Sequence, residues 1–168
     1  MMKTGQYLFI TTIGGSMYYS FELLFRGFSH WTMYLLGGIC FLFMYVQGKI
    51  LYWRESMAKM IFKCTVFIAS TEFITGIIVN KFFKWNVWDY SDQPFNLFGQ
   101  ICVPFTIIFS GLSAIGIILS GYIGYWVFGE EKPHFHHRIR AQRQTHLRRR
   151  AVTENYVPKR FLRHSPFG

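Results

Sequence analysis

Residues 70–102 read STEFITGIIVNKFFKWNVWDYSDQPFNLFGQIC, and the interpretation of the whole chain depends on this stretch. It begins inside an apolar segment, 64–80, in which Glu72 is the one charged residue. It then enters a loop rich in aromatic and polar side chains. A carboxylate in the middle of a membrane helix costs about 2.5–3.5 kcal/mol on insertion scales unless a neighbour pairs with it. Glu72 therefore predicts either a polar site or a polar contact between helices inside a membrane protein.

The composition of the chain is typical of a membrane protein. Of its 168 residues, 51% are hydrophobic and only 15% are charged, whereas about 25% are charged in an ordinary soluble domain. Uncharged runs extend over 27–48 and 93–129, and about 20 apolar residues suffice to cross the hydrocarbon core of a bilayer. We expect an all-α fold: a four-helix transmembrane bundle with an outer loop of aromatic and polar residues. The expected helices are at about 6–25, 31–50, 61–80 and 104–128.

The connection at about 81–103 is long enough for a short surface helix or a partly re-entrant segment, and its DYSDQP sequence also carries strong turn signals. The last helix is expected to begin near Pro104 and to end near Phe128, before Gly129. Small residues recur along it at Ser110, Ala114, Gly116, Ser120 and Gly124. They allow helix backbones to approach closely, within the bundle or in a homo-oligomer, and packing within the bundle is the favoured interpretation.

The charges divide the chain into a bundle at 1–131 and a basic tail at 132–168. The net charge is +9 in the tail and +1 in the rest of the chain. Attraction to anionic lipids is the favoured interpretation of a basic tail beside a membrane helix, ahead of a protein partner and of nucleic acid, and we expect much of the tail to be disordered. Basic residues also dominate the connection between the second and third helices. We therefore expect a multi-pass protein of the cell membrane with both termini in the cytoplasm.

The candidate site residues cluster around Glu72. Glu22 and Arg26 stand four residues apart at the end of the first helix, in the orientation that favours an ion pair. We expect Arg26 to be the first cation to pair with Glu72, through or beside Glu22, with Lys81 and Lys84 as alternatives. The loop adds four more candidates, which are Trp88, Asp89, Tyr90 and Asn96.

Each of these candidates has a structural interpretation beside the functional one. Glu22 and Arg26 would also suit an ion pair at the membrane interface, and Glu72 a polar clamp between the first and third helices. The loop residues would also suit interface anchors and turns, although aromatic rings beside acids can bind a cationic or amphipathic ligand.

Several kinds of chemistry have no motif in this sequence. The three cysteines, Cys40, Cys64 and Cys102, lack metal-ligand spacing, so we expect no metal site and no cofactor. The sequence has no nucleotide-binding loop and no zinc-protease or nucleophile-elbow motif. If a transport cycle here uses ATP, the subunit that hydrolyses the ATP has to be a separate ATPase chain.

Residues 72–76 (EFITG), 88–91 (WDYS) and 94–102 (PFNLFGQIC) resemble the CmpB-like family of ABC-transporter type IV permeases. Glu22 with Arg26 is similar to the acid and the nearby arginine in the first helix of that family. The resemblance implies a small multi-pass bacterial membrane protein acting as a permease component. The sequence departs from the family pattern after the first helix, where the family has a Gly-Pro segment leading into the second helix and this chain has no evident counterpart.

These observations favour a permease-like or ligand-binding membrane subunit with a polar site in the outer half of the bundle. Small uncharged or cationic solutes fit this site better than large anions, because Arg26 is its one cation. A non-catalytic scaffold or assembly factor is the alternative. A small lipid-modifying enzyme with Glu72 and Asp89 as acid and base is a weaker one, so an enzyme is the less favoured class.

Overall fold

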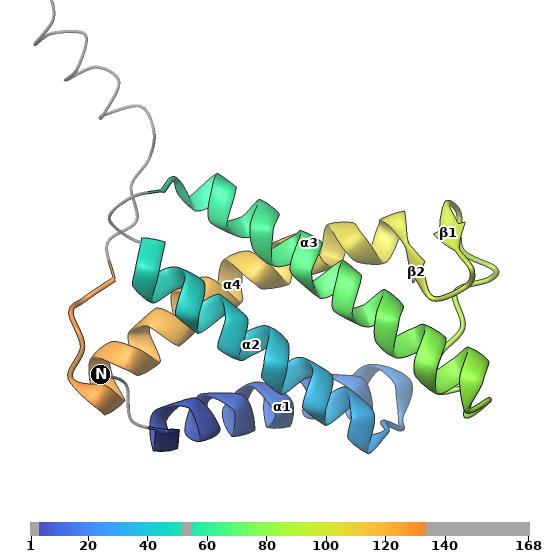
Figure 1. The fold of residues 1–168 in the computed structure, drawn as a ribbon, viewed down its shortest axis with the longest axis horizontal. Helices are drawn as coiled ribbons and strands as arrows, with labels where there is room; N and C mark the ends of the chain where they lie inside the picture. Colours follow the sequence, from blue (N-terminus) through green and yellow to red (C-terminus); the bar gives the residue numbers. More distant parts are fainter. Residues whose placement is uncertain (1–3, 52–54, 134–168) are drawn as a thin grey trace, which may run out of the picture. The chain divides into compact units, whose positions relative to one another are not determined.

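A computed structural model describes residues 4–51 and 55–133 of the chain. Four α-helices make up most of this part: α1 (Thr4–Arg26), α2 (Trp31–Leu51), α3 (Met57–Gly76) and α4 (Val103–Phe128). A π-helical segment, η1 (Ile77–Phe82), continues α3. Two short antiparallel strands, β1 (Asn96–Leu97) and β2 (Ile101–Cys102), precede α4 (Figure 1). The predicted all-α fold with four helices is confirmed, while the predicted basic tail lies outside the described residues from position 134 onward.

The helix boundaries follow from local chemistry. Pro104 lies in the first turn of α4, where the missing amide hydrogen of proline costs no helical hydrogen bond. Gly129 ends the helix because it adopts a left-handed conformation with φ of 65°, which glycine reaches without steric cost. The observed limits of α4, Val103 and Phe128, lie within one residue of the expected 104 and 128.

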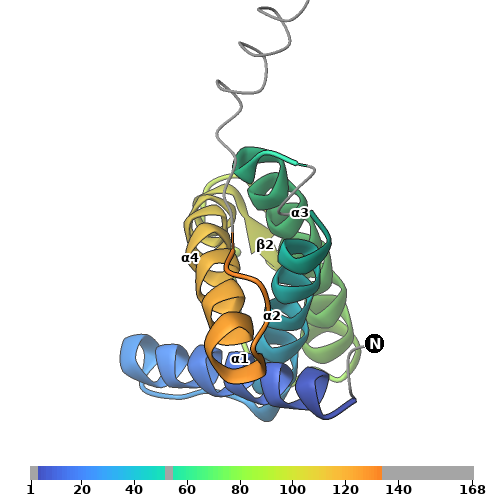
Figure 2. The ribbon, with the colours of Figure 1, turned by 90° about the vertical axis from the view of Figure 1, so that its left-hand side faces the viewer.

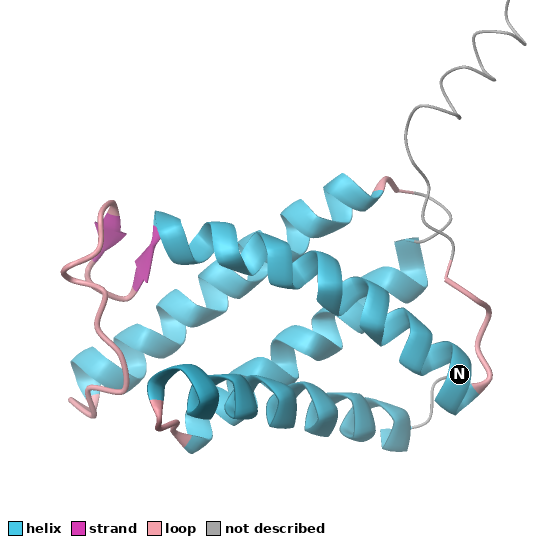
Figure 3. Cartoon of the chain, turned by 180° about the vertical axis from the view of Figure 1, so that it is seen from behind, coloured by secondary structure: helices cyan, strands magenta, loops and turns pink. Residues whose placement is uncertain are grey.

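The connection from η1 to α4 differs from one of the expectations. Residues 83–102 contain turns and the β1–β2 hairpin but no helix, so the short surface helix, one of the two alternatives that the length of the connection allowed, does not form. Four non-glycine residues of this connection have positive φ, Lys84, Asn86, Phe95 and Phe98. The left-handed conformation is incompatible with a right-handed helix. Figure 3 shows the two strands together at one end of the bundle.

The four helices alternate in direction. The rings of Phe9 and Phe128 meet edge to face, with centroids 5.6 Å apart, so the start of α1 lies beside the end of α4. Lys49 at the end of α2 pairs with Glu130, just after α4. We call this the basic end of the bundle, and the end that holds Arg26 and the 83–102 connection the loop end. In Figure 2, α2, α3 and α4 are foreshortened, while α1 runs across the lower part of the view.

Three of the described helices are long and apolar enough to cross a membrane. They span Trp31–Ile50, Met57–Phe82 and Val103–Phe128, so the chain is a membrane protein. Helix α1 is long enough, with 23 residues, but it is less apolar and is not among these candidate spans. That all four helices cross the bilayer, with both termini on one side, stays a prediction.

Glycines bring α1 and α2 into close contact. A Cβ atom on Gly15 would lie 2.5 Å from the Tyr34 carbonyl oxygen, and one on Gly38 would lie 2.6 Å from the Thr11 carbonyl oxygen. Such distances are too short for any larger residue, so the two backbones pack directly against each other. This packing fixes the position of Glu22 near the end of α1. Along α4, the predicted small residues Gly116, Ser120 and Gly124 face the bundle interior.

Candidate functional site

Glu72 lies on α3 at the loop end, with 2% of its surface exposed. The Tyr90 hydroxyl donates a hydrogen bond to Glu72 Oε1 at 3.2 Å. Two contacts hold Tyr90 in place: its ring stacks on Phe105 with centroids 4.6 Å apart, and its backbone N–H donates to the Gly99 carbonyl at 2.8 Å. The loop therefore brings a fixed hydrogen-bond donor to the buried carboxyl group.

The electrostatic surroundings of Tyr90 keep its hydroxyl protonated. Burial raises the pKa of the Tyr90 phenol, and the nearby Glu72 carboxylate and Tyr18 phenol raise that pKa further. The Arg26 guanidinium lowers it by a smaller amount. These interactions show that α1, α3 and the loop place Tyr18, Arg26, Glu72 and Tyr90 in one neighbourhood.

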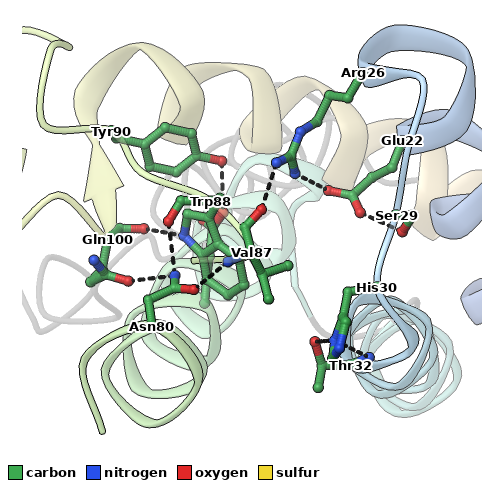
Figure 4. A network of polar contacts seen from close by, with 11 residues as sticks. Glu22, Arg26, Ser29, His30, Thr32, Asn80, Val87, Trp88, Tyr90 and Gln100 are labelled. Atoms are coloured by element: carbon green, nitrogen blue, oxygen red, sulfur yellow. Dashed lines mark hydrogen bonds and ion pairs between the residues drawn. The ribbon is translucent and has the colours of Figure 1, made fainter. Parts of the chain in front are cut away.

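Glu22 and Arg26 form the ion pair that their spacing predicts. Arg26 donates to Glu22 Oε1 at 2.9 Å, and the Ser29 hydroxyl donates to Glu22 Oε2 at 2.6 Å. The second terminal nitrogen of Arg26 donates to the Val87 carbonyl oxygen at 2.6 Å. Figure 4 shows this side chain reaching from the end of α1 to the loop. Arg26 thus joins two segments that lie 61 positions apart in the sequence.

Arg26 was expected to pair with Glu72, through or beside Glu22, and the structure shows its contact with Glu22 but no ion pair with Glu72. Arg26 is committed to Glu22 and to the Val87 carbonyl. Of the described lysines, arginines and histidines, none forms an ion pair with Glu72. The physical reason is proximity along α1: Glu22 is one helical turn from Arg26 and captures its guanidinium.

A second hydrogen-bonded network holds the loop against η1. Asn80 Nδ2 donates to the Trp88 carbonyl at 2.9 Å and to Gln100 Oε1 at 2.8 Å. Asn80 Oδ1 accepts the Val87 N–H at 2.7 Å. The Trp88 indole N–H in turn donates to the Gln100 carbonyl at 3.0 Å (Figure 4). Asn80, Trp88 and Gln100 are all buried, so this network sets the position of the loop.

Gly76 makes room for that network on α3. A Cβ atom at Gly76 would lie 2.5 Å from Gln100 Oε1 and 3.1 Å from the Trp88 ring. A larger side chain there would push the loop away from the helix. The predicted site residue Trp88 is therefore part of the support of the loop.

Asp89 and Asn96 lie on the exposed side of the loop and shape its turns. Asp89 Oδ1 accepts the Ser91 N–H at 2.9 Å and the Ser91 hydroxyl at 2.5 Å. These hydrogen bonds lower the pKa of the Asp89 carboxyl group. Asn96 Nδ2 donates to the carbonyls of Ser91 and Gln93 at 3.0 and 2.9 Å. Both side chains thus stabilise turns, the structural interpretation that their sequence context also allowed.

Of the predicted site residues, the structure brings four together: Glu22, Arg26, Glu72 and Tyr90. Sequence reasoning missed Asn80 and Gln100 as site-forming residues. The available signal was their polarity: each is an uncharged amide next to an apolar segment, where a buried amide needs hydrogen-bond partners. Within residues 4–51 and 55–133, no three His, Cys, Asp or Glu side chains are grouped so as to hold a metal ion.

Residues 7–141, which include most of α1 and everything from α2 through α4, match the family described as "Putative ABC-transporter type IV" (CmpB). The chain belongs to this family. The resemblance noted at Glu22 and Arg26 and within residues 72–102 is confirmed, and the match extends well beyond those segments. No curated protein and no solved structure matches the chain. Its helices and its family together make it a membrane protein of an ABC-transporter family.

Proposed function

We propose that this CmpB-family chain is a permease-like membrane subunit with a polar site at the loop end, formed by Glu22, Arg26, Glu72 and Tyr90. The site takes a proton or a small cationic solute. One observation carries this proposal: the Glu72 carboxyl group is buried, and no described cation pairs with it.

The charge balance of the site supports a cationic solute. Beside the neutral Tyr90 phenol, its ionisable groups are two carboxyl groups and one guanidinium, and Arg26 already neutralises Glu22. A buried charge without a partner costs several kcal/mol, so a proton or a bound cation has to balance Glu72. Acids inside membrane helices commonly serve this purpose in transporters.

The rest of the transport machinery comes from other chains in this proposal. The sequence contains no nucleotide-binding loop, so ATP hydrolysis is assigned to a separate ATPase subunit. Purification from native membranes, followed by identification of the proteins that accompany the chain, tests this assignment. A nucleotide-binding subunit in that preparation supports the proposal, and its repeated absence favours a role without ATP.

A membrane scaffold is the second candidate, because the polar groups at the loop end are extensively bonded within the chain. The Asn80 network and the Glu22–Arg26 contacts already use protein partners. The weaker enzyme hypothesis gains no support, since Asp89 serves a turn on the exposed side of the loop and no described contact joins it to Glu72.

Glu72→Gln separates the two candidates, because glutamine keeps the size and the hydrogen bond from Tyr90 but lacks the charge. The thermal unfolding midpoint of the purified chain is measured with sodium, potassium, ammonium or choline chloride at equal ionic strength. If the site binds a cation, one of these salts raises the wild-type midpoint above the others, and Glu72→Gln abolishes that difference.

Glu131→Gln is the matched control, since Glu131 is an exposed acid after α4, and it keeps the wild-type response. Equal midpoints in all four salts, or a response that survives Glu72→Gln, would reject cation binding at this site. If Glu72→Gln also retains full function in cells, the scaffold is the better description.

A further inference from the structure

A groove lies on the outside of the bundle, along the seam between α2 and α3. Its volume is about 450 Å³. Phe43 of α2 and Phe62, Val66 and Phe67 of α3 supply its apolar lining. Phe43 and Phe67 stack with ring centroids 3.8 Å apart and so hold the two helices together at the groove. Neither this groove nor its residues belong to the site at the loop end.

The groove faces the region that lipid would occupy around the protein. Both helices that form it are long and apolar enough to span a membrane. Phe62 and Val66 are 70% and 48% exposed, so one wall is open to the surroundings. An apolar groove that is open sideways between two spans is accessible to an acyl chain from the bilayer.

Three polar side chains line the same groove, Gln47, Lys63 and Ser70, and the Ser70 hydroxyl donates to the Val66 carbonyl of its own helix. Lys63 lies less than two turns from the start of α3, at the basic end, with its side chain 43% exposed. A lysine in this position extends its ammonium group toward the lipid headgroups while its stem covers apolar surface. Its present partner is Glu55, whose two carboxylate oxygens both lie 2.8 Å from the ammonium. Gln47 Oε1 is buried and has no hydrogen-bond partner within the described part of the chain, and such a group gains from any donor that an occupant brings.

From this arrangement we propose that the groove binds one anionic phospholipid of the surrounding bilayer. The phosphate lies at Lys63, and an acyl chain lies along Phe43, Phe67 and Val66. The charge of Lys63 at the headgroup level, with apolar side chains beside it, matches the two ends of such a lipid. The site belongs to the leaflet at the basic end, and it is independent of the function proposed for the loop end.

Lipid retention by the full-length protein tests the charged end of the groove. The chain is purified in a neutral detergent, mixed with phosphatidylglycerol or phosphatidylcholine, and analysed by native mass spectrometry. We expect one tightly retained phosphatidylglycerol. Lys63→Gln is expected to weaken its binding about fivefold, the ratio given by about 1 kcal/mol per cation near an anionic surface. Glu55→Gln is expected to strengthen it, because the ammonium of Lys63 loses its competing carboxylate.

Lys59→Gln is the matched control, since Lys59 is exposed one turn earlier on α3 and does not line the groove. It leaves phosphatidylglycerol binding at the wild-type level. Equal losses from Lys59→Gln and Lys63→Gln would show general attraction to a basic surface and overturn the proposal.

A second pair of variants tests the apolar part. Val66→Trp fills the groove and is expected to abolish retention of the lipid, whereas Val127→Trp, at an exposed valine of α4, leaves it unchanged. Wild-type retention by Val66→Trp would overturn the proposal. So would a wild-type dimer that Val66→Trp dissociates, because a second copy of the chain would then occupy the groove.

Discussion

Replacing Asn80 by leucine tests whether the loop is held on η1 by buried hydrogen bonds. Leucine has a similar volume but can neither donate nor accept. The change removes the three hydrogen bonds between Asn80 and the Val87 N–H, the Trp88 carbonyl and the Gln100 side chain. Asn80 is 7% exposed, so water has little access to the groups that lose their partner.

The expected cost follows from the number of groups left unpaired. A buried donor or acceptor without a partner costs about 1–3 kcal/mol. Three such groups give a loss of at least about 3 kcal/mol, a large share of the roughly 5–15 kcal/mol that stabilises a typical protein. Trp88 keeps its own indole hydrogen bond to the Gln100 carbonyl, which limits how far the loop can move.

Asn96→Leu is the matched control for this measurement. Asn96 also makes three hydrogen bonds to the backbone of the loop, one of them accepted from the Gly99 N–H at 3.2 Å. Asn96 is exposed, so water replaces its contacts, and we expect a loss of about 1 kcal/mol. The purified variants are unfolded with a denaturing detergent while circular dichroism monitors the transition, and the two losses of unfolding free energy are compared. Equal losses for Asn80→Leu and Asn96→Leu would refute the reasoning from burial.

Two further predictions concern the charged residues of the loop end. Arg26→Gln leaves the buried Glu22 without its cation. In the same unfolding assay, we therefore expect Arg26→Gln to destabilise the chain more than the double variant Glu22→Gln/Arg26→Gln does. A double variant that is less stable than Arg26→Gln would contradict this. The pKa of Asp89 is lower in the folded chain than in the unfolded chain. The Asp89 turn therefore contributes its full stability at pH values above the pKa of the unfolded chain, and this contribution is lost as the pH falls through the pKa of the folded chain. Ser91→Ala removes a hydrogen bond to the Asp89 carboxylate and is expected to raise its pKa, as NMR titration of the carboxyl carbon can measure; an unchanged pKa would show that the Ser91 hydroxyl has no part in the shift.

The helices of this protein were predictable because membrane helices leave a strong mark on a sequence. The uncharged runs at 27–48 and 93–129 contain nearly all of α2 and α4. The Glu22–Arg26 pair was predictable as well, since four residues along a helix bring two side chains to the same face. Each of these features is encoded within a single helix, by its composition or by the spacing of two residues along it.

The contacts of the loop were harder to predict because they join distant parts of the chain. Two of these contacts depend on how residues 83–102 fold back onto η1. They are the hydrogen bond from Arg26 to the Val87 carbonyl and the hydrogen bonds by which Asn80 holds the loop. Positive φ angles at Lys84 and Phe98 set that path, and lysine and phenylalanine give no sequence signal for them. The turn roles of Asp89 and Asn96 were open alternatives that the residue types alone did not decide.

The π-helical segment η1 places a constraint on chain length. Each residue of an α-helix advances about 100° around the axis, so a continuous α-helix would set Glu72 and Asn80 about 80° apart. A π-turn rotates less per residue, and Glu72, Gly76 and Asn80, each four residues after the one before, are all buried. With the same number of residues and an ordinary α-helical pitch, Asn80 would turn away from the face of Glu72, and only a chain one residue shorter between them would bring it back to within about 20°. The spacing between the carboxyl group and the amide is thus fixed by a count of residues as much as by their identity.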